Sequence, residues 1–287
     1  MKIFELILLI GFVNGCNTNR DDSNRLGKDN FSDTISVRQD FKKYFTNCNV
    51  NGSITIYDNN QHRWIMSDTT DAKMETLPAS TFKIINILVA LETGVIKDEN
   101  EIVEWVGKTD TSLYGYRPDI YHGMTVKEAF QVSAGWVFLE LAKKIGKENY
   151  KKFLAKCDYG NANISDATAD FWNFGSLGIT PVNQIEFLKK LYSNDLPFSR
   201  RNIDIVKSVM ITVQNENFTI RGKTGQTKSG ENKIGWWVGY IETAKGVFFF
   251  ATRITQLKKS NDKNFRNCRI DVTNSILKEL NVIQSTE

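Results

Sequence analysis

Histidine is nearly absent from this chain of 287 residues, in which only His62 and His122 carry an imidazole. Imidazole is a common metal ligand and the usual base for a hydroxyl nucleophile. Cysteine is also scarce, and Cys48, Cys157 and Cys268 follow no zinc-binding or C-x-x-C spacing. We therefore expect no metal site, and a hydroxyl nucleophile would need a base other than histidine. The three cysteines permit one disulfide in any of three pairings, but we expect buried free thiols.

Charge of one sign is not concentrated anywhere in the sequence. The net charge is +4, from 37 basic and 33 acidic residues spread along the chain. Without an arginine-rich block or a basic stripe with interleaved aromatics, we do not expect a nucleic-acid partner. Hydrophobic residues make up 41% and charged residues 24%, which is typical of a soluble globular protein with an ample core.

The apolar stretch near the N-terminus, residues 7–13, is too short to cross a bilayer as a stable helix. It predicts a secretory signal over residues 1–15. The segment 13–16 (VNGC) resembles a bacterial lipoprotein box, in which Cys16 is acylated and becomes the mature N-terminus. The alternative is a plain cleaved signal with an incidental cysteine. We predict a polar tether over 16–36, a membrane anchor through Cys16, and a location in the periplasm or cell envelope.

Hydrophobic periodicity predicts an α+β fold for residues 37–287, with a central antiparallel β-sheet flanked by helices and a helical region inserted at about 97–215. Strands are expected at 52–58, 62–66, 218–223, 233–241 and 246–254; helices are expected from 37 through Phe45, at 84–91, 126–133, 136–144, 147–156, 182–192, 200–213 and 265–280. The last three strands follow one another with short connections, which is typical of an antiparallel meander.

The segment 78–83 (PASTFK) stands directly before an apolar run of helical length at 84–91. Ser80 is therefore expected at a helix start with Lys83 one turn further on the same face. A hydroxyl needs a base to become a nucleophile, and Lys83 is the nearer candidate. A free lysine is almost fully protonated at neutral pH. Lys83 could act as a base if burial lowered its pKa, or if carbon dioxide added to its neutral amine to give an anionic carbamate.

Two further segments carry groups suited to the same chemistry. Ser133 lies in the segment 131–135 (QVSAG), at a break between two expected helices, where its hydroxyl could pass a proton to a leaving group. The strand ending in 223–225 (KTG) places Lys223 and Thr224 at the rim of a cleft. Gly225 would let a ligand approach the backbone closely.

The order S-x-x-K, serine motif and K-T-G resembles the penicilloyl-serine transferase superfamily. In finer detail the chain resembles the class D β-lactamases, or oxacillinases. Four segments carry this likeness, namely 78–84 (PASTFKI), 158–161 (DYGN), Phe171-Trp172 together with 182–188 (VNQIEFL), and 235–239 (GWWVG). The similarity spans roughly residues 37 to 282 with the motifs in the order of the family, which makes it far more specific than any one tripeptide.

The resemblance implies a serine hydrolase that opens penicillin-type β-lactams and confers resistance to them, with no cofactor beyond the carbon dioxide or bicarbonate that carboxylates Lys83. It implies that Ser80 is the acylated nucleophile, carboxylated Lys83 the general base, Trp172 a donor to the carbamate, and Ser133 a proton relay. It further implies that Lys223, Thr224, Gly225, Gln226 and Arg269 hold the substrate, the main-chain N–H groups of Ser80 and Gln226 forming the oxyanion hole.

One position departs from the pattern of the family. Where the serine motif normally ends in a hydrophobic residue that covers the modified lysine, this chain has Gly135. The gap admits water or a movable neighbour, for which Trp136 is the candidate. A lost carbamate would turn the hydrolase into an acyl trap, so the second hypothesis is a sensor-like protein that retains the acyl group. A peptidoglycan transpeptidase or carboxypeptidase is a third, disfavoured by the Tyr159 and Trp172 segments.

Overall fold

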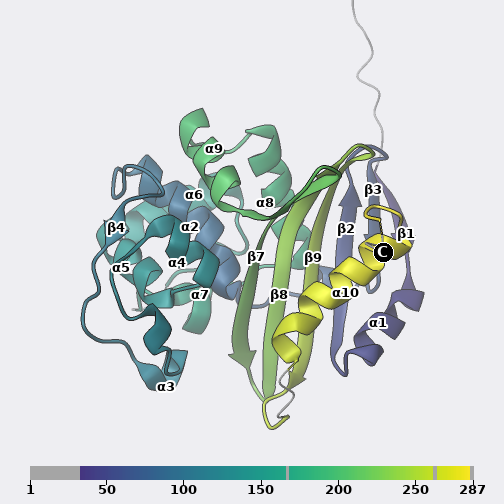
Figure 1. Ribbon diagram of the computed structural model, residues 1–287, viewed down its shortest axis with the longest axis horizontal. Helices are drawn as coiled ribbons and strands as arrows, with labels where there is room; N and C mark the ends of the chain where they lie inside the picture. Colours follow the sequence, from purple (N-terminus) through teal and green to yellow (C-terminus); the bar gives the residue numbers. More distant parts are fainter. Residues whose placement is uncertain (1–32, 166–167, 261–263, 285–287) are drawn as a thin grey trace, which may run out of the picture. The chain divides into compact units, whose positions relative to one another are not determined.

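A seven-stranded sheet runs through the part of the chain that the computed structural model describes, residues 33–165, 168–260 and 264–284 (Figure 1). Its strands lie in the order β1 (Thr34–Val37), β3 (Arg63–Met66), β2 (Asn51–Asp58), β9 (Gly246–Leu257), β8 (Asn232–Thr243), β7 (Phe218–Ser229) and β6 (Ile211–Gln214). A second, two-stranded sheet pairs β4 (Ile102–Val103) with β5 (Met124–Thr125). The sheet thus combines strands from both ends of the chain, as predicted. The predicted signal and Cys16 lie outside the described residues.

The α-helices are α1 (Lys42–Asn47), α2 (Lys83–Glu92), α3 (Thr111–Tyr114), α4 (Val126–Val132), α5 (Gly135–Ile145), α6 (Lys147–Cys157), α7 (Phe171–Phe174), α8 (Pro181–Ser193), α9 (Arg200–Val209) and α10 (Phe265–Glu279). Short 3-10 helices are η1 (Gln39–Phe41), η2 (Asp71–Lys73), η3 (Ala79–Phe82) and η4 (Pro118–Ile120). Seven of the α-helices, α3 to α9, fall between β4 and β6, which confirms the predicted helical insertion.

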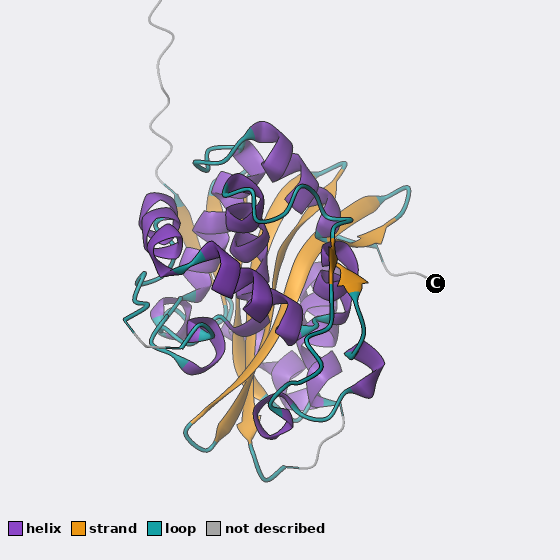
Figure 2. Cartoon of the chain, turned by 90° about the vertical axis from the view of Figure 1, so that its left-hand side faces the viewer, coloured by secondary structure: helices purple, strands orange, loops and turns teal. Residues whose placement is uncertain are grey.

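Alternation along β8 divides the core into two layers. Trp236, Val238 and Tyr240 pack into one apolar cluster, whereas Trp237 and Ile241 pack into the other. Successive side chains of a strand point to opposite faces, so each face of the sheet needs its own cover. Figure 1 shows α10 lying across β8 and β9 on one face, and Figure 2 shows the inserted helices stacked in front of the other.

Helix α2 is the centre of the helical layer. Every residue from Lys83 to Leu91 is buried, although one of them is a lysine and one is Asn86. A helix that is apolar on all sides belongs in the interior of a protein. The same run of side chains therefore buries Lys83 at its first turn.

The structure corrects two predicted boundaries. Residues 34–36, assigned to the tether, belong to β1, which pairs in parallel with β3, so the sheet is mixed rather than wholly antiparallel. The helix expected to reach Val213 ends at Val209, and Ile211–Gln214 forms β6 against β7. The reason is local, because the β-branched run 211–213 fits a pleated strand better than a helix end.

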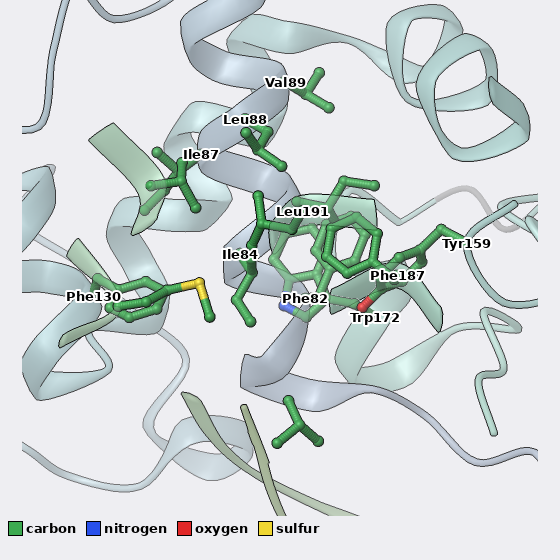
Figure 3. Packing of buried hydrophobic residues seen from close by; sticks show 14 of the residues in the cluster. Phe82, Ile84, Ile87, Leu88, Val89, Phe130, Tyr159, Trp172, Phe187 and Leu191 are labelled. Atoms are coloured by element: carbon green, nitrogen blue, oxygen red, sulfur yellow. The ribbon is translucent and has the colours of Figure 1, made fainter. Parts of the chain in front are cut away.

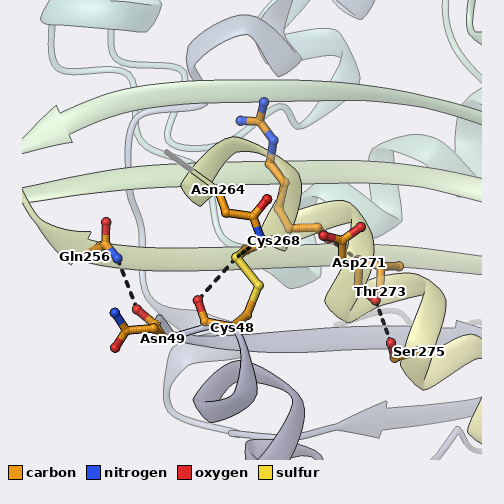
Figure 4. Close-up of a disulfide and its surroundings, with 9 residues drawn as sticks. Cys48, Asn49, Gln256, Asn264, Cys268, Asp271, Thr273 and Ser275 are labelled. Atoms are coloured by element: carbon orange, nitrogen blue, oxygen red, sulfur yellow. Dashed lines mark hydrogen bonds between the residues drawn. A yellow bond between two sulfur atoms is a disulfide. The ribbon is translucent and has the colours of Figure 1, made fainter. Parts of the chain in front are cut away.

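The expectation of free thiols is wrong for two of the three cysteines. Cys48, directly after α1, forms a disulfide with Cys268 in the first turns of α10, across 220 positions of sequence (Figure 4). Both elements cover the same face of the sheet, which brings the two sulfurs together. Cys157 is free and buried, as predicted.

The disulfide gives a stability prediction. Cys48→Ser should lower the free energy of unfolding by about 2–4 kcal/mol, because the cross-link restricts the unfolded chain across a long loop. Urea unfolding measures this difference. Reductant should destabilise the parent equally and leave the variant unchanged. Thiol titration shows when the disulfide of the parent is fully reduced. If the stability of the reduced parent equals that of the oxidised parent, the prediction is contradicted.

Candidate active site

The turn that carries Ser80 is strained and tightly held. Ala79, which precedes it, has a left-handed φ of 52°, a conformation that a residue with a Cβ adopts at a cost. The Thr81 hydroxyl donates to the carbonyl of Pro78 at 2.7 Å and accepts from the Gln184 amide at 2.8 Å. These bonds tie the turn to α8 and hold Ser80 within η3, three residues before α2 begins at Lys83.

Strand β7 approaches this turn so closely that a side chain in place of Gly225 would crowd it. A Cβ added at Gly225 would lie 3.0 Å from the carbonyl oxygen of Pro78 and 3.3 Å from the main-chain nitrogen of Ser80. The Arg269 guanidinium donates to the Gly225 carbonyl from α10. The backbone of β7 and the Ser80 turn therefore line the cleft side by side.

Two lysines converge on one hydroxyl. Lys83 Nζ lies 3.0 Å and Lys223 Nζ 3.1 Å from Ser133 Oγ, and Lys223 also donates to the carbonyl of Thr224 at 3.0 Å. Ser133 follows α4 in a left-handed conformation with φ 59°, which turns the chain between α4 and α5. A hydroxyl that accepts from two amines keeps its own proton for a third group.

The electrostatics of the two amines differ from those of a surface lysine. Lys83 is 1% exposed, and burial, followed by the charge of Lys223, holds the pKa of its amine well below the usual range. Burial and then the charge of Arg269 lower the pKa of Lys223 to about 7. Desolvation disfavours the ammonium form. Both amines therefore lose their proton more readily than a surface lysine does.

Trp172 offers an unused donor next to Phe82, the residue that precedes Lys83. Its ring stacks on Phe82 with centroids 4.9 Å apart and a 10° interplanar angle, in the apolar cluster drawn in Figure 3. Its indole Nε1 is buried and has no hydrogen-bond partner among the described residues. A buried donor without a partner is costly, so it fits an acceptor that the bare chain lacks. The carboxylate of a carbamate on Lys83 is such an acceptor.

The residues selected from the sequence come together around one cleft of about 650 Å³. Those that line it are Ser80, Ser133, Thr224, Gly225, Gln226 and Arg269, while Lys83, Lys223 and Trp172 are buried. Arg266 also lines the cleft, but Arg269 is the arginine bonded to β7. The volume suits a small-molecule ligand.

The sequence did not reveal Asp170 or its contact with Tyr114. The Tyr114 hydroxyl donates to one carboxylate oxygen of Asp170, and the Asn173 amide donates to the other at 2.8 Å. Asp170 is 3% exposed, and burial raises its pKa to about 6. The one signal in the sequence that could have pointed to Asp170 is its position directly before Phe171-Trp172.

Tyr114, not Trp136, is the neighbour that approaches Gly135. A Cβ on Gly135 would lie 3.7 Å from the Tyr114 ring. Trp136 is buried, and its indole donates to the Ile120 carbonyl at 2.7 Å, so the expectation of a movable Trp136 is wrong. The helix direction explains this, because successive residues of α5 point to different sides.

Among the described residues, no group of three or more histidine, cysteine, aspartate or glutamate side chains could hold a metal ion. Within the same residues, no helix has both the length and the apolar character needed to cross a membrane.

The chain is similar to known families, proteins and structures. The family described as penicillin binding protein transpeptidase domain matches residues 49–280. Beta-lactamase OXA-2 of Salmonella typhimurium is 37% identical over 227 residues, which cover 78% of this chain and 79% of that protein. Beta-lactamase OXA-48 of Klebsiella pneumoniae is 36% identical over 240 residues, covering 84% and 87%. A class D beta-lactamase structure from Sebaldella termitidis has a TM-score of 0.82 at 38% identity, covering 88% of this chain and 99% of that one.

The position of Arg269 gives a prediction about Lys223. Arg269→Gln should raise the pKa of the Lys223 amine above its value of about 7, because it removes the positive charge that disfavours the ammonium form. An NMR titration of the lysine side chains measures the shift. Arg266→Gln is the matched control and should leave Lys223 unchanged. An equal effect of both variants would show that general charge, not this contact, sets the pKa.

Proposed function

Since this chain belongs to the class D serine β-lactamases, hydrolases of the β-lactam ring, we propose that Ser80 is its nucleophile and that Lys83, carboxylated by carbon dioxide, is its general base. The observation that carries the proposal is the pairing of a buried amine of lowered pKa with an unpartnered indole donor. The amine can react with carbon dioxide, and the indole of Trp172 can bind the product.

Carboxylation of Lys83 needs only carbon dioxide and a neutral amine, and burial of Lys83 favours the neutral amine. The lone pair of the neutral amine attacks the carbon of carbon dioxide, an N–C bond forms, and one N–H proton leaves to water. The added carboxylate supplies an anionic base, which a neutral or protonated lysine lacks. Burial of Lys83, whose Nζ lies 4.9 Å from the ring centroid of Phe138, disfavours the charged form of the amine.

Ser80 gives its proton to this base as its Oγ attacks the carbonyl carbon of the lactam. The main-chain N–H groups of Ser80 and Gln226 stabilise the oxyanion that develops there. As the lactam C–N bond breaks, Ser133 donates its proton to the leaving nitrogen, and the Lys223 ammonium replaces that proton. Through water, the Lys223 amine then recovers the proton that the base took from Ser80, so the base is free again. In the second half of the reaction, the base takes a proton from water as the water oxygen attacks the acyl carbon, and it returns this proton to Ser80 Oγ as the ester C–O bond breaks.

The substrate carboxylate is assigned to the cationic side of the cleft. Arg269 lies behind Gly225, and Thr224 and Lys223 precede it on β7. An arginine and a hydroxyl suit a carboxylate because both can donate hydrogen bonds to it. We assign penicillin-type β-lactams as substrates and β-lactam resistance as the consequence. The alternative, retention of the acyl group as in a sensor, rests on Gly135 and an unstable carbamate.

We also propose that the chain is exported and held at a membrane through a lipid on Cys16, in the periplasm or cell envelope. The support is the segment 13–16 and the short apolar stretch before it.

The central test is turnover of a chromogenic penicillin by the full-length chain with and without bicarbonate, followed by the intact mass. We expect multiple turnovers that bicarbonate increases, and a transient adduct. Ser80→Ala should form no adduct. Trp172→Phe, which keeps an aromatic ring against Phe82 but removes the N–H, should need more bicarbonate for the same rate.

A single stoichiometric burst that leaves a stable adduct on Ser80 would favour the sensor alternative instead. The absence of any adduct or turnover would contradict the proposed role of Ser80. A Trp172→Phe variant with the bicarbonate dependence of the parent would remove Trp172 from the proposal and leave Ser80 in it.

The lipid proposal has its own test in a bacterial host. Cys16→Ser should move the protein from the membrane fraction to the soluble fraction and remove the mass of the acyl chains. Thr18→Ser is the matched control and should stay with the membrane. A parent protein that is soluble and begins after a different cleavage point would support the plain signal.

A further inference from the structure

The Tyr114 ring packs against Gly135, two residues after Ser133, whose hydroxyl lies 3.0 Å from Lys83 Nζ. The edge of its ring lies in van der Waals range of a Cβ built on Gly135, at 3.7 and 3.8 Å. Tyr114 ends the short helix α3, and its ring also contacts Phe174 of α7 edge-on, with centroids 5.6 Å apart. An aromatic side chain from a separate segment thus packs against the position where a side chain on residue 135 would begin.

The Tyr114 side chain is held by a buried carboxylate. Asp170 accepts from the Tyr114 hydroxyl and from the Asn173 amide, and it makes no ion pair among the described residues. The main-chain carbonyl of Asn173 in turn accepts from the Thr227 hydroxyl of β7 at 3.1 Å. Tyr114 is therefore tied both to α7 and to the strand that carries Lys223.

Asp170 also acts on Lys83 through its charge. The carboxylate favours the ammonium form of Lys83, opposing burial, Lys223 and Arg117, which disfavour it. A carboxylate and a carbamate carry like charges, and the low dielectric of the pocket strengthens their repulsion. An ionised Asp170 thus opposes carboxylation in two ways, because its charge stabilises the ammonium form of Lys83 and repels the carbamate.

We propose that Tyr114 and Asp170 form a polar cover over Lys83 in place of an apolar side chain at position 135, and that Asp170 is a positioning residue that weakens the hold of Lys83 on carbon dioxide. The inference rests on the proposed carboxylation of Lys83. It assigns opposite effects to two hydrogen-bonded side chains. The Tyr114 hydroxyl keeps the cover closed and the pocket dry, whereas the charge of Asp170 limits how much carbamate forms.

The test compares variants that separate charge from cover. Asp170→Asn keeps an oxygen that can accept from Tyr114 but removes the charge. Tyr114→Phe, made within Asp170→Asn, then removes only the hydrogen bond and keeps the ring. Matched controls are Asp195→Asn, an exposed carboxylate after α8, and Tyr116→Phe, whose parent side chain is 75% exposed.

Two readouts are measured on the full-length proteins. One is the carbamate signal in 13C NMR with labelled bicarbonate, and the other is the bicarbonate concentration that gives half-maximal turnover. Asp170→Asn should lower that concentration by about tenfold, the equivalent of one pKa unit of interaction. Adding Tyr114→Phe should raise it again, and both controls should match the parent. Opposite shifts from two contacting residues would not follow from a general loss of structure.

The possible failures are distinguishable. If neither the parent nor Asp170→Asn shows a carbamate signal, carboxylation is overturned and this inference with it. If the parent shows the signal and Asp170→Asn has the same half-maximal bicarbonate concentration, the inference is overturned while the proposed function stands. If Asp170→Asn abolishes turnover even at saturating bicarbonate, Asp170 is itself required for the chemistry, and the inference is wrong.

Discussion

Burial of one amine organises the active site. Lys83 occupies the first turn of a helix whose other residues are almost all apolar, so packing that helix into the core carries the lysine inside. An isolated ammonium in such a place is very costly, so the group shifts its pKa instead of keeping its charge. The chemistry proposed for Lys83 is therefore a consequence of the same hydrophobic packing that stabilises the helical layer.

The groups around Lys83 provide polar partners for its buried amine. The Ser133 hydroxyl accepts a hydrogen bond from the Lys83 amine, and the Trp172 indole supplies a donor that has no partner among the described residues. Lys223, itself buried, adds a second amine whose pKa lies near neutrality. Two neighbouring amines of lowered pKa allow one to serve on the acid side of a proton relay and the other on the base side.

The outer wall of the site depends on long-range contacts. Arg269 reaches β7 from α10, and Cys268 beside it is joined to Cys48 at the opposite end of the domain sequence. The start of α10 is thus fixed both to the sheet and to the segment after α1. The disulfide therefore restrains α10, the helix that carries Arg269, which we propose binds the substrate carboxylate.

Much of the site could be predicted from the sequence because its chemistry is encoded in short motifs. Ser80 and Lys83 are three residues apart, and helix geometry alone puts them on one face. The segments around Ser133 and Lys223 stand at a helix break and a strand end, where local patterns are readable. The apolar alternation in residues 233–254 predicted the strands for the same reason.

The sequence by itself determined the order of the motifs, the helix that buries Lys83, and the central strands, because each depends on residues close together along the chain. Only the tertiary structure decided that Cys48 pairs with Cys268, that Trp172 is left with a free donor, and that Tyr114 and Asp170 meet beside Gly135. These contacts join segments tens to hundreds of positions apart. No local periodicity specifies them, since they arise only when the whole chain packs.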